Sequence, residues 1–257
     1  MLRVVVDAGA SGAWNMAVDE ALLDDPEGGW TLRLYRWDRP TISLGYAQPH
    51  ERGVDMVVAR RLKIPVVRRP TGGRAVLHAD ELTYALTGPV DHGPLSGGVS
   101  RSYRRIAAGL QAGLRRLGAD LRIERNGLTP RPSSKGPCFS ARTRYELSAG
   151  GRKVVGSAQR RRDGRLLQHG AVLLGHPDRR LWAALGAGHR QAAESSIGLV
   201  EILGRRPAAR ALAFSLSEAL GEALRLTPRR GVLSRAEIRR ARGLEAKYRD
   251  VEWTQRR

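Results

Sequence analysis

The sequence Arg-Arg-Pro-Thr-Gly-Gly-Arg-Ala-Val-Leu-His at residues 68–78 combines an arginine pair, a Gly-Gly pair, a further arginine and a histidine in one short segment. An apolar run, Ile64-Pro-Val-Val67, precedes it, and Ala75-Val-Leu77 is apolar again. This order predicts a strand, a tight glycine turn and a second strand. Gly72 and Gly73 can adopt positive φ, and their bare backbone lets a ligand approach. An ordinary hairpin is the competing interpretation, and the surrounding charge argues against it.

The chain has 257 residues, of which 41% are apolar and 27% charged, an ordinary composition for a globular protein. This length predicts one large domain, or one domain with a small appendage. No apolar run approaches the length that spans a membrane, and Met1-Leu-Arg-Val-Val-Val-Asp7 lacks the long apolar segment of a signal peptide. We therefore expect a first strand here, a cytoplasmic protein and no membrane partner.

The formal net charge of +20 would fit an acidic partner such as nucleic acid. Only four of the 45 basic residues are lysines, and the arginines are scattered along the whole chain, a pattern that also fits genome-wide codon bias. There is no basic tail, and the 5% aromatic residues form no platform on which bases could stack. The composition therefore disfavours nucleic acid and leaves an acidic protein partner open.

The spacing of apolar residues divides the chain into strands and helices. Strands are predicted at residues 2–6, 31–37, 40–46, 81–87, 121–125, 153–160 and 166–174, the last two joined through Asp163-Gly164 as a hairpin. Helices are predicted at residues 11–23, 51–62, 99–117, around 181–185, at 208–226 and at 234–248. Residues 126–139 form the longest irregular segment, and such loops are often functional. The pattern indicates an α+β fold, a mixed sheet with helices and a helical C-terminal third.

Two further segments could line a site. In Gly151-Arg-Lys-Val-Val-Gly-Ser-Ala-Gln159 a lysine enters a strand of small residues, which leave room for a ligand. An ammonium group in such a slot can hold an anion or polarise a carbonyl, although a solvated lysine beside a turn fits as well. The second segment is Leu167-Gln-His-Gly-Ala171, whose histidine alone would be a satisfied core residue.

The single cysteine, Cys138, excludes an intrachain disulfide and lies in the irregular segment, within Pro137-Cys-Phe-Ser140. In a loop of a strongly basic protein a thiol can have a lowered pKa and act as a nucleophile, whereas a cysteine taken alone is more often structural. The sequence has no glycine loop ending in Gly-Lys-Ser/Thr, no dinucleotide fingerprint and no Cys/His cluster at zinc spacing. We therefore expect no metal site.

Four motifs together resemble the biotin/lipoate protein ligase superfamily, specifically its lipoate ligase and octanoyltransferase branch. They follow in order at residues 43–48 (Ser-Leu-Gly-Tyr-Ala-Gln), 68–78, 151–158 and 168–170 (Gln-His-Gly). The resemblance covers about residues 10–175. It extends to the end, because Leu244-Glu-Ala-Lys-Tyr248, Trp253 and Arg256-Arg257 are similar to the tail of the cysteine-dependent octanoyltransferases.

The resemblance implies a largely antiparallel sheet flanked by helices, with an acyl-binding catalytic domain at 1–190 and a helical segment packed on it at 191–257. It also implies a tunnel for a medium-length acyl chain, with the arginines of residues 68–78 facing the carrier that delivers this chain. Arg74 stands where many relatives have a third glycine, and it would either narrow the tunnel or contact the phosphopantetheine of the donor. The implied catalytic residues are Cys138 and Lys153, and the implied substrate-binding residues are Arg69, Thr71, Gly72, Gly73, Arg74, His78, Gly156, Ser157, Ala158, Gln168, His169 and Gly170.

Two branches of the family have to be separated. Ligases activate a free acid with ATP, whereas octanoyltransferases form an acyl-enzyme on a cysteine. Cys138 lies in the matching place before the lysine strand, Gln168-His-Gly170 replaces the His-His-Gly more frequent in ligases, and 257 residues leave little room for the accessory domain of ligases. All three points favour the transferase.

The expected reaction moves an octanoyl group from octanoyl-acyl carrier protein to a lysine of a lipoyl domain, such as the glycine-cleavage H protein. It requires no cofactor. In the expected mechanism the Cys138 thiolate attacks the thioester and Lys153 holds the carbonyl oxygen. An ATP- and magnesium-dependent lipoate ligase, and an amidotransferase that moves octanoyl between two carrier domains, stay open as alternatives.

Overall fold

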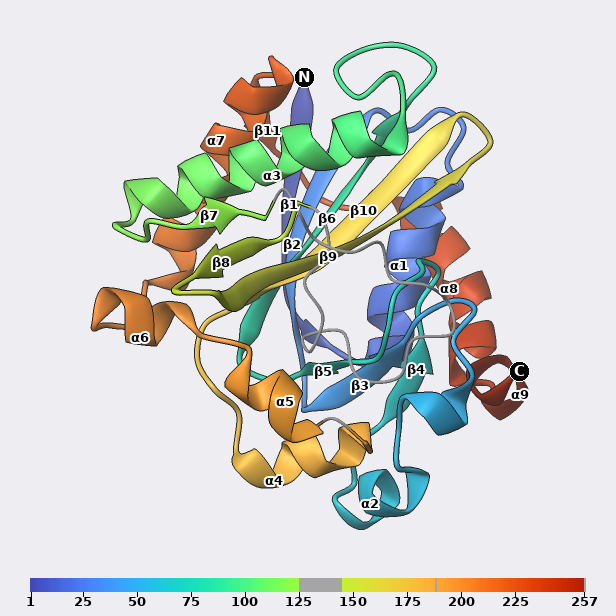
Figure 1. Cartoon of the computed structure of the whole chain (residues 1–257). Helices are drawn as coiled ribbons and strands as arrows, with labels where there is room; N and C mark the ends of the chain where they lie inside the picture. Colours follow the sequence, from blue (N-terminus) through green and yellow to red (C-terminus); the bar gives the residue numbers. More distant parts are fainter. Residues whose placement is uncertain (125–144, 188, 257) are drawn as a thin grey trace.

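The computed structural model describes residues 1–124, 145–187 and 189–256 (Figure 1). Its largest element is an eight-stranded sheet with the order β11-β1-β2-β6-β10-β9-β8-β7. The strands are β1 (Leu2–Ala10), β2 (Trp30–Trp37), β6 (Glu81–Pro89), β7 (Arg122–Ile123), β8 (Leu147–Ala149), β9 (Arg152–Arg162), β10 (Arg165–Leu173) and β11 (Pro228–Arg230). β1 runs parallel to β2 and β11, and the remaining pairs are antiparallel. The predicted α+β fold with a largely antiparallel sheet is confirmed.

Helices cover both faces of this large sheet (Figure 1). On one face lie α3 (Val99–Arg116) and α7 (Ala209–Leu224), and on the other α1 (Gly12–Leu23) and α8 (Arg235–Arg249). Successive strand residues point to opposite faces, so Leu34 of β2 joins the core with α3 and α7, whereas Tyr35 joins the core with α1 and α8. Because side chains alternate along a strand, the residues of β2 contribute in turn to the two cores on opposite faces of the sheet.

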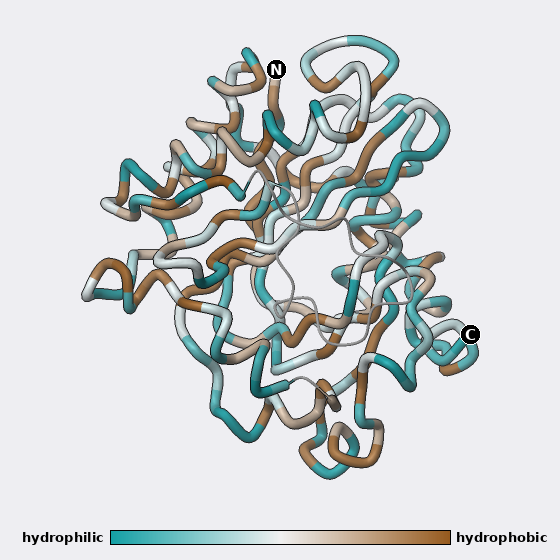
Figure 2. Tube along the Cα trace, viewed as in Figure 1, coloured by the Kyte–Doolittle hydropathy of each residue, from teal (hydrophilic) through white to brown (hydrophobic). Residues whose placement is uncertain are grey.

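Local signals set the ends of several elements as predicted. α1 begins at Ser11, whose hydroxyl accepts a hydrogen bond from the backbone N–H of Trp14 at 3.2 Å. The hairpin of β9 and β10 turns through Asp163 and Gly164 with φ of 50° and 70°, the left-handed values of a tight hairpin turn. Figure 2 shows this tip as hydrophilic, with hydrophobic residues farther along the strands.

A smaller three-stranded sheet contains the segment around the glycine pair. It consists of β3 (Thr41–Leu44), β4 (Val66–Arg68) and β5 (Val76–His78), in the order β4-β3-β5. The two predicted strands form, but they do not pair with each other, because β3 lies between them, parallel to β4 and antiparallel to β5. The predicted tight turn is therefore wrong, since the connecting loop has to cross the width of one strand.

The helix predicted at residues 51–62 is also wrong in its first half. A short 3-10 turn, η1 (His50–Arg52), is followed by the helix α2 (Met56–Arg61). Asp55 separates them because its carboxylate caps α2, accepting from the backbone N–H groups of Val57 and Val58 at 3.0 Å. The side chain of Val57, placed on the apolar face by the prediction, is 76% exposed.

The C-terminal third is mainly helical and also contributes β11 to the large sheet. The division of the chain at residue 190 stays a prediction. None of the described helices is long and apolar enough to cross a lipid bilayer. The remaining elements are α4 (Arg179–Trp182), η3 (Ala183–Leu185), α5 (His189–Glu194), α6 (Leu199–Leu203) and α9 (Val251–Gln255).

Candidate active site

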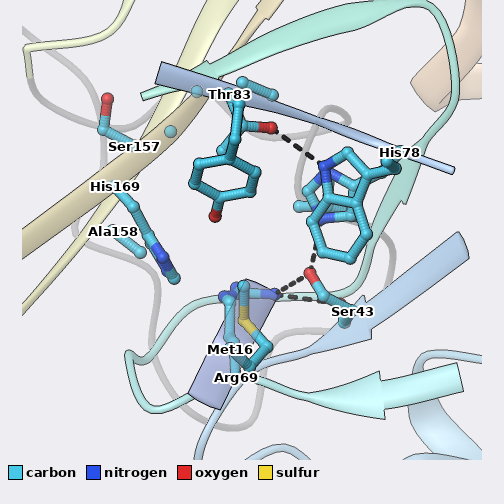
Figure 3. Close-up of a pocket in the computed structure, with 14 residues that line it drawn as sticks. Met16, Ser43, Arg69, His78, Thr83, Ser157, Ala158 and His169 are labelled. Atoms are coloured by element: carbon cyan, nitrogen blue, oxygen red, sulfur yellow. Dashed lines mark hydrogen bonds between the residues drawn. The ribbon is translucent and has the colours of Figure 1, made fainter. Parts of the chain in front are cut away.

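A cavity with an empty volume of about 410 Å³ lies between the large and the small sheet. Most of the atoms on its surface are apolar, and Met16 of α1 contributes to its lining (Figure 3). The structure brings seven of the predicted substrate-binding residues to it: Arg69, His78, Gly156, Ser157, Ala158, His169 and Gly170. The other lining residues are Met16, Tyr35, Trp37, Ser43, Val76, Thr83 and Ala171. Three distant parts of the sequence therefore meet at one site, as their shared family resemblance implied.

The large-sheet wall of the cavity carries His169 on β10. Its Nδ1 lies 2.9 Å from Oδ2 of Asp19 in α1, and its Nε2 lies 2.6 Å from the hydroxyl of Thr71. Burial lowers the pKa of His169 below its ordinary value of 6.5, and the Asp19 carboxylate opposes this shift. A neutral ring with its proton on Nδ1 satisfies both contacts, because Nδ1 then donates to Asp19 and Nε2 accepts from Thr71.

Asp19 also holds two other buried groups of this wall. Its Oδ1 accepts from Nη1 of Arg33 at 3.0 Å, and its Oδ2 accepts from the hydroxyl of Tyr35 at 2.8 Å. The side chains of Arg33 and Asp19 are both 0% exposed, so this is a fully buried ion pair. The carboxylate therefore contacts three side chains from two strands, β2 and β10.

The small-sheet wall carries a second histidine with a carboxylate behind it. Nδ1 of His78 lies 2.7 Å from Oε1 of Glu81, and its Nε2 lies 2.8 Å from the hydroxyl of Ser43. The indole of Trp37 stacks on the His78 ring with centroids 4.0 Å apart. The Trp37 indole N–H donates to Thr83 at 2.9 Å, so the ring that covers His78 is itself held in place.

Arg69 organises the loop between β4 and β5 from inside. Its guanidinium donates to the carbonyl oxygen of Ser43 at 2.9 Å, to that of Gly72 at 2.7 Å and to that of Arg74 at 2.8 Å. Gly73 within the loop has φ of 91°, a conformation that favours glycine. Thr71 contacts His169, as described above, but Thr71, Gly72, Gly73, Arg74 and Gln168 do not line the cavity themselves.

Arg68 turns away from the cavity and fastens the C-terminal end of the chain. Its side chain is fully buried, and its N–H groups donate to six backbone carbonyl oxygens. Burial, with the nearby cations Arg256 and Arg69, lowers the pKa of Arg68 to about 10. The expectation that Arg68 and Arg69 face a carrier is therefore wrong, because backbone carbonyls bind both. The six acceptors belong to Gly45, Tyr46, Gln48, Trp253, Thr254 and Arg256.

Comparison with known proteins decides the family. The lipoyl protein ligase A/B catalytic domain matches residues 11–202. The octanoyltransferase LipM of Moorella thermoacetica is 40% identical, with 98% of this chain and 97% of the relative covered. That of Kyrpidia tusciae is 38% identical, with 99% and 98% covered. The chain belongs to the lipoyl protein ligase A/B catalytic domain family. The prediction of an acyltransferase enzyme is confirmed by these relatives.

Solved structures of this family have the same fold. A lipoate protein ligase from T. acidophilum with bound lipoic acid matches with a TM-score of 0.81 and 24% identity, over 98% of both chains. A lipoate-protein ligase A bound with ATP matches with a TM-score of 0.82 and 25% identity, again over 98% of both chains. The family architecture therefore extends through the C-terminal helices of this chain.

Of the two predicted catalytic residues, only Lys153 lies within the described part of the chain. Cys138 lies outside the described residues. Lys153 of β9 is 5% exposed, and its ammonium forms an ion pair with Glu146, which is 4% exposed. The backbone of Lys153 is fixed as well, because its N–H donates to the carbonyl of Ser195 at 2.7 Å and its carbonyl accepts from Ile197 at 2.9 Å. Lys153 is not one of the lining residues, so its role in catalysis stays a prediction.

The family motifs missed the residues that support the two histidines. Asp19 and Glu81 were not predicted as site residues, although each is a buried carboxylate within 3 Å of a histidine nitrogen in the wall. An acidic residue inside the apolar run from Met16 to Leu23 was an available signal, because such a residue has to find a partner inside the protein. Among the described residues, no three His, Cys, Asp or Glu side chains are grouped so that they could hold a metal ion.

Proposed function

We propose that this chain transfers an octanoyl group from octanoyl-acyl carrier protein to a lysine of a lipoyl domain, such as the glycine-cleavage H protein. The observation that carries the proposal is the cavity itself, an apolar space at the family motifs whose wall at Gly156, Ala158 and Gly170 has no bulky side chain. Small-molecule sites are lined mainly by apolar side chains with a few polar groups, and this cavity follows that pattern, with His78, His169 and Arg69 among its apolar lining. The octanoyltransferases among the relatives support this choice of acyl group.

The proposed reaction has two steps through a thioester on Cys138. The thiolate of Cys138, whose proton has passed to solvent, attacks the octanoyl carbonyl, a new C–S bond forms, and the thioester C–S bond of the carrier breaks. The carrier leaves as a thiolate, which takes up a proton from solvent. The amine of the acceptor lysine then attacks the acyl-cysteine, the amide bond forms, and the Cys138 thiolate leaves as the amine loses its proton. An amide is more stable than a thioester, so the proposed reaction needs neither ATP nor a metal ion.

Lys153 would stabilise the negative charge that develops on the carbonyl oxygen in both steps. Its ammonium forms an ion pair with the buried Glu146 carboxylate, a contact that holds the end of the side chain in place. The backbone hydrogen bonds of Lys153 would keep the base of this side chain in place.

Intact-mass spectrometry tests the proposal. The protein is mixed with octanoyl-acyl carrier protein, and a mass increase of one octanoyl group is expected that hydroxylamine removes. Cys138→Ala should abolish the acyl-enzyme, and Lys153→Ala should lower its rate of formation by about 100-fold or more. Lys63→Gln changes an exposed lysine and serves as the matched control.

The same assay separates the alternatives. Full transfer by Cys138→Ala from the octanoyl carrier protein would contradict the cysteine mechanism. Labelling of an acceptor domain from free lipoate, ATP and magnesium, surviving loss of Cys138, would support the ligase alternative. The structural neighbour bound with ATP is the reason to include that arm. Acylation from octanoyl-H protein instead of the acyl carrier protein would support an amidotransferase.

A further inference from the structure

A group of arginines and aromatic rings stands beside the loop of the candidate active site. We call it the rim cluster and define it as Tyr46, Arg160, Trp253 and Arg256. The guanidinium carbon of Arg160 lies 4.3 Å from the ring centroid of Tyr46, and that of Arg256 lies 4.0 Å from the same centroid. Arg256 also lies 3.9 Å from the ring centroid of Trp253. Two cations therefore share one aromatic ring, and their positive charges lie close together beside the active-site loop.

The rim cluster differs from the buried arginines of the same chain in its partners. The N–H groups of Arg68 and Arg33 donate to carbonyl oxygens or carboxylates inside the protein. Arg160 donates to the carbonyl of Pro70 at 2.9 Å, and Arg256 donates to the carbonyl of Tyr46 at 2.7 Å. Both side chains are partly exposed, and within the described part of the chain no ion pair joins either of them to a carboxylate. Both also hydrogen-bond to the side chain of Tyr46, and since each guanidinium has five N–H donors, further donors are left for a ligand.

The cluster is joined directly to the cavity wall. The backbone N–H of Tyr46 donates to the carbonyl of Thr71 at 2.8 Å, and the hydroxyl of Thr71 contacts His169 in the wall. Arg160 follows the lining residue Ala158 by two positions on β9, and it bonds the loop at Pro70. A molecule bound by these two arginines would therefore stand one loop away from the cavity.

The buried Arg68 explains why the cluster exists. Its guanidinium binds the carbonyls of the turn at Tyr46 and of the tail at Arg256 at once, at 3.2 Å and 3.0 Å. The indole N–H of Trp253 returns a hydrogen bond to the carbonyl of Arg68 at 3.1 Å. Arg68 therefore brings the C-terminal tail to the turn at Tyr46, where Arg256 meets the Tyr46 ring. Arg160 is held separately, by the carbonyl of Pro70 and the same ring. Both guanidinium groups are thus placed before a ligand binds, so less side-chain entropy is lost on binding.

The geometry points to a docking site for an acidic carrier domain. We propose that Arg160 and Arg256 bind surface carboxylates of the carrier that delivers the acyl group, an assignment that rests on the proposed function. Planar guanidinium forks match carboxylates, and the net charge of +20 would attract an acidic protein to the molecule as a whole. The aromatic rings already hold cations of the chain itself, so they do not offer free faces on which bases of a nucleic acid could stack.

The test uses a double variant and three donors. Arg160→Gln with Arg256→Gln is compared with the wild type for acyl-enzyme formation from octanoyl carrier protein, from octanoyl-phosphopantetheine and from the octanoyl thioester of N-acetylcysteamine. We expect kcat/KM to fall about tenfold for the carrier protein, with a smaller salt dependence. The two small donors should react within about twofold of the wild-type rate, since they present no acidic protein surface. Equal losses with all three donors, or no loss with any, would overturn the proposal.

Matched controls separate charge at this place from charge in general. Arg229→Gln with Arg230→Gln removes two exposed arginines at the sheet edge on β11 and should keep the wild-type rates. The single variant Arg256→Gln leaves the contact between Arg160 and the loop at Pro70 intact. Tm is recorded for every variant. A loss confined to the two donors that carry phosphopantetheine would assign the arginines to its phosphate and contradict docking of a protein surface.

A binding measurement distinguishes failure of this inference from failure of the proposed function. Fluorescence anisotropy of labelled carrier protein without an acyl group, titrated at several salt concentrations, needs no catalysis. If the wild type binds and the double variant binds about tenfold more weakly, the docking site stands even where no acyl transfer occurs. Tight binding of a labelled RNA, lost through the same two substitutions, would replace the carrier with a nucleic acid and refute the proposal.

Discussion

Each wall of the cavity has a histidine in contact with a buried carboxylate, but the surroundings of the two carboxylates differ. On the large-sheet wall His169 contacts Asp19, and on the small-sheet wall His78 contacts Glu81. Asp19 is shared with a buried arginine and a tyrosine, so both of its oxygens are occupied. Oε1 of Glu81 accepts from Thr83 at 2.6 Å and contacts His78, while its Oε2 has no hydrogen-bond partner in the described part of the chain.

The large-sheet wall thus contains a buried ion pair, whereas the small-sheet wall depends on hydrogen bonds to backbone carbonyls. Removing the charge of Asp19 would leave Arg33 buried without its main counterion. The small-sheet wall depends instead on Arg69, whose N–H groups bind the carbonyls of the loop. His169 thus contacts a carboxylate that is itself part of a buried ion pair, whereas His78 lies next to a loop whose shape depends on Arg69.

The largest expected effect comes from Asp19→Asn compared with Glu81→Gln. An amide at position 19 has to direct its NH₂ group at Arg33 or at Tyr35 and His169, so one good contact is lost in either orientation. We expect a loss of about 3 kcal/mol in the free energy of unfolding for Asp19→Asn, at the lower end for a broken buried pair because Asp7 still pairs with Arg33. Glu81→Gln keeps one oxygen for its partners and should lose about 1 kcal/mol. Urea unfolding measures both, and equal losses would remove the distinction between the walls.

Arg69→Lys tests the small-sheet wall. A lysine has three donors on one nitrogen, so it cannot reach the carbonyls of Ser43, Gly72 and Arg74 together. We expect a loss of about 2 kcal/mol in unfolding free energy, because buried carbonyls lose their donors. Arg229→Lys is the exposed control and should change stability by less than about 0.5 kcal/mol. Protection of the amides of residues 71–75 in hydrogen exchange should fall in the Arg69 variant alone.

Gly170→Ala tests how closely the large-sheet wall is packed. A Cβ at this position would lie 2.4 Å from the carbonyl oxygen of Gly156 and 2.8 Å from Cε1 of Tyr84. We expect a cost of about 1–3 kcal/mol and a smaller cavity, which weakens octanoyl binding more than binding of a shorter acyl group. In Gly243→Ala, a Cβ would meet nothing within 4 Å, and this helical site should gain up to about 1 kcal/mol.

The smallest effect is a pH dependence of stability from His169. Its pKa in the folded protein is lowered by burial, whereas the unfolded chain binds a proton at the ordinary value of about 6.5. As the pH falls below 6.5, the unfolded state binds more protons than the folded state, and stability decreases. His169→Gln should flatten the unfolding free energy between that pH and the lower folded pKa. An unchanged slope would show that His169 is charged in the folded protein.

The sequence predicted the elements whose signals are local. Ser11 and the hairpin turn at Gly164 act through their immediate neighbours. As expected, Ser11 caps the start of α1, and Gly164 joins β9 to β10. The glycine pair gave a wrong turn, because the pairing of β4 and β5 with β3 depends on a strand more than twenty residues earlier. Three of the family motifs supplied seven lining residues, since the fold brings these distant segments to one cavity.

What the sequence alone determined is the family, through four motifs in order, and the presence of a glycine-rich wall. The tertiary structure decided which way the charged side chains of residues 68–78 point. Arg68 and Arg69 are adjacent, yet one binds the C-terminal tail and the other binds the loop beside the cavity. Asp19 and His169 are 150 positions apart and meet only because α1 packs on β10. A buried charge takes the partner that folding brings within hydrogen-bond distance, and that partner is not encoded by spacing along the chain.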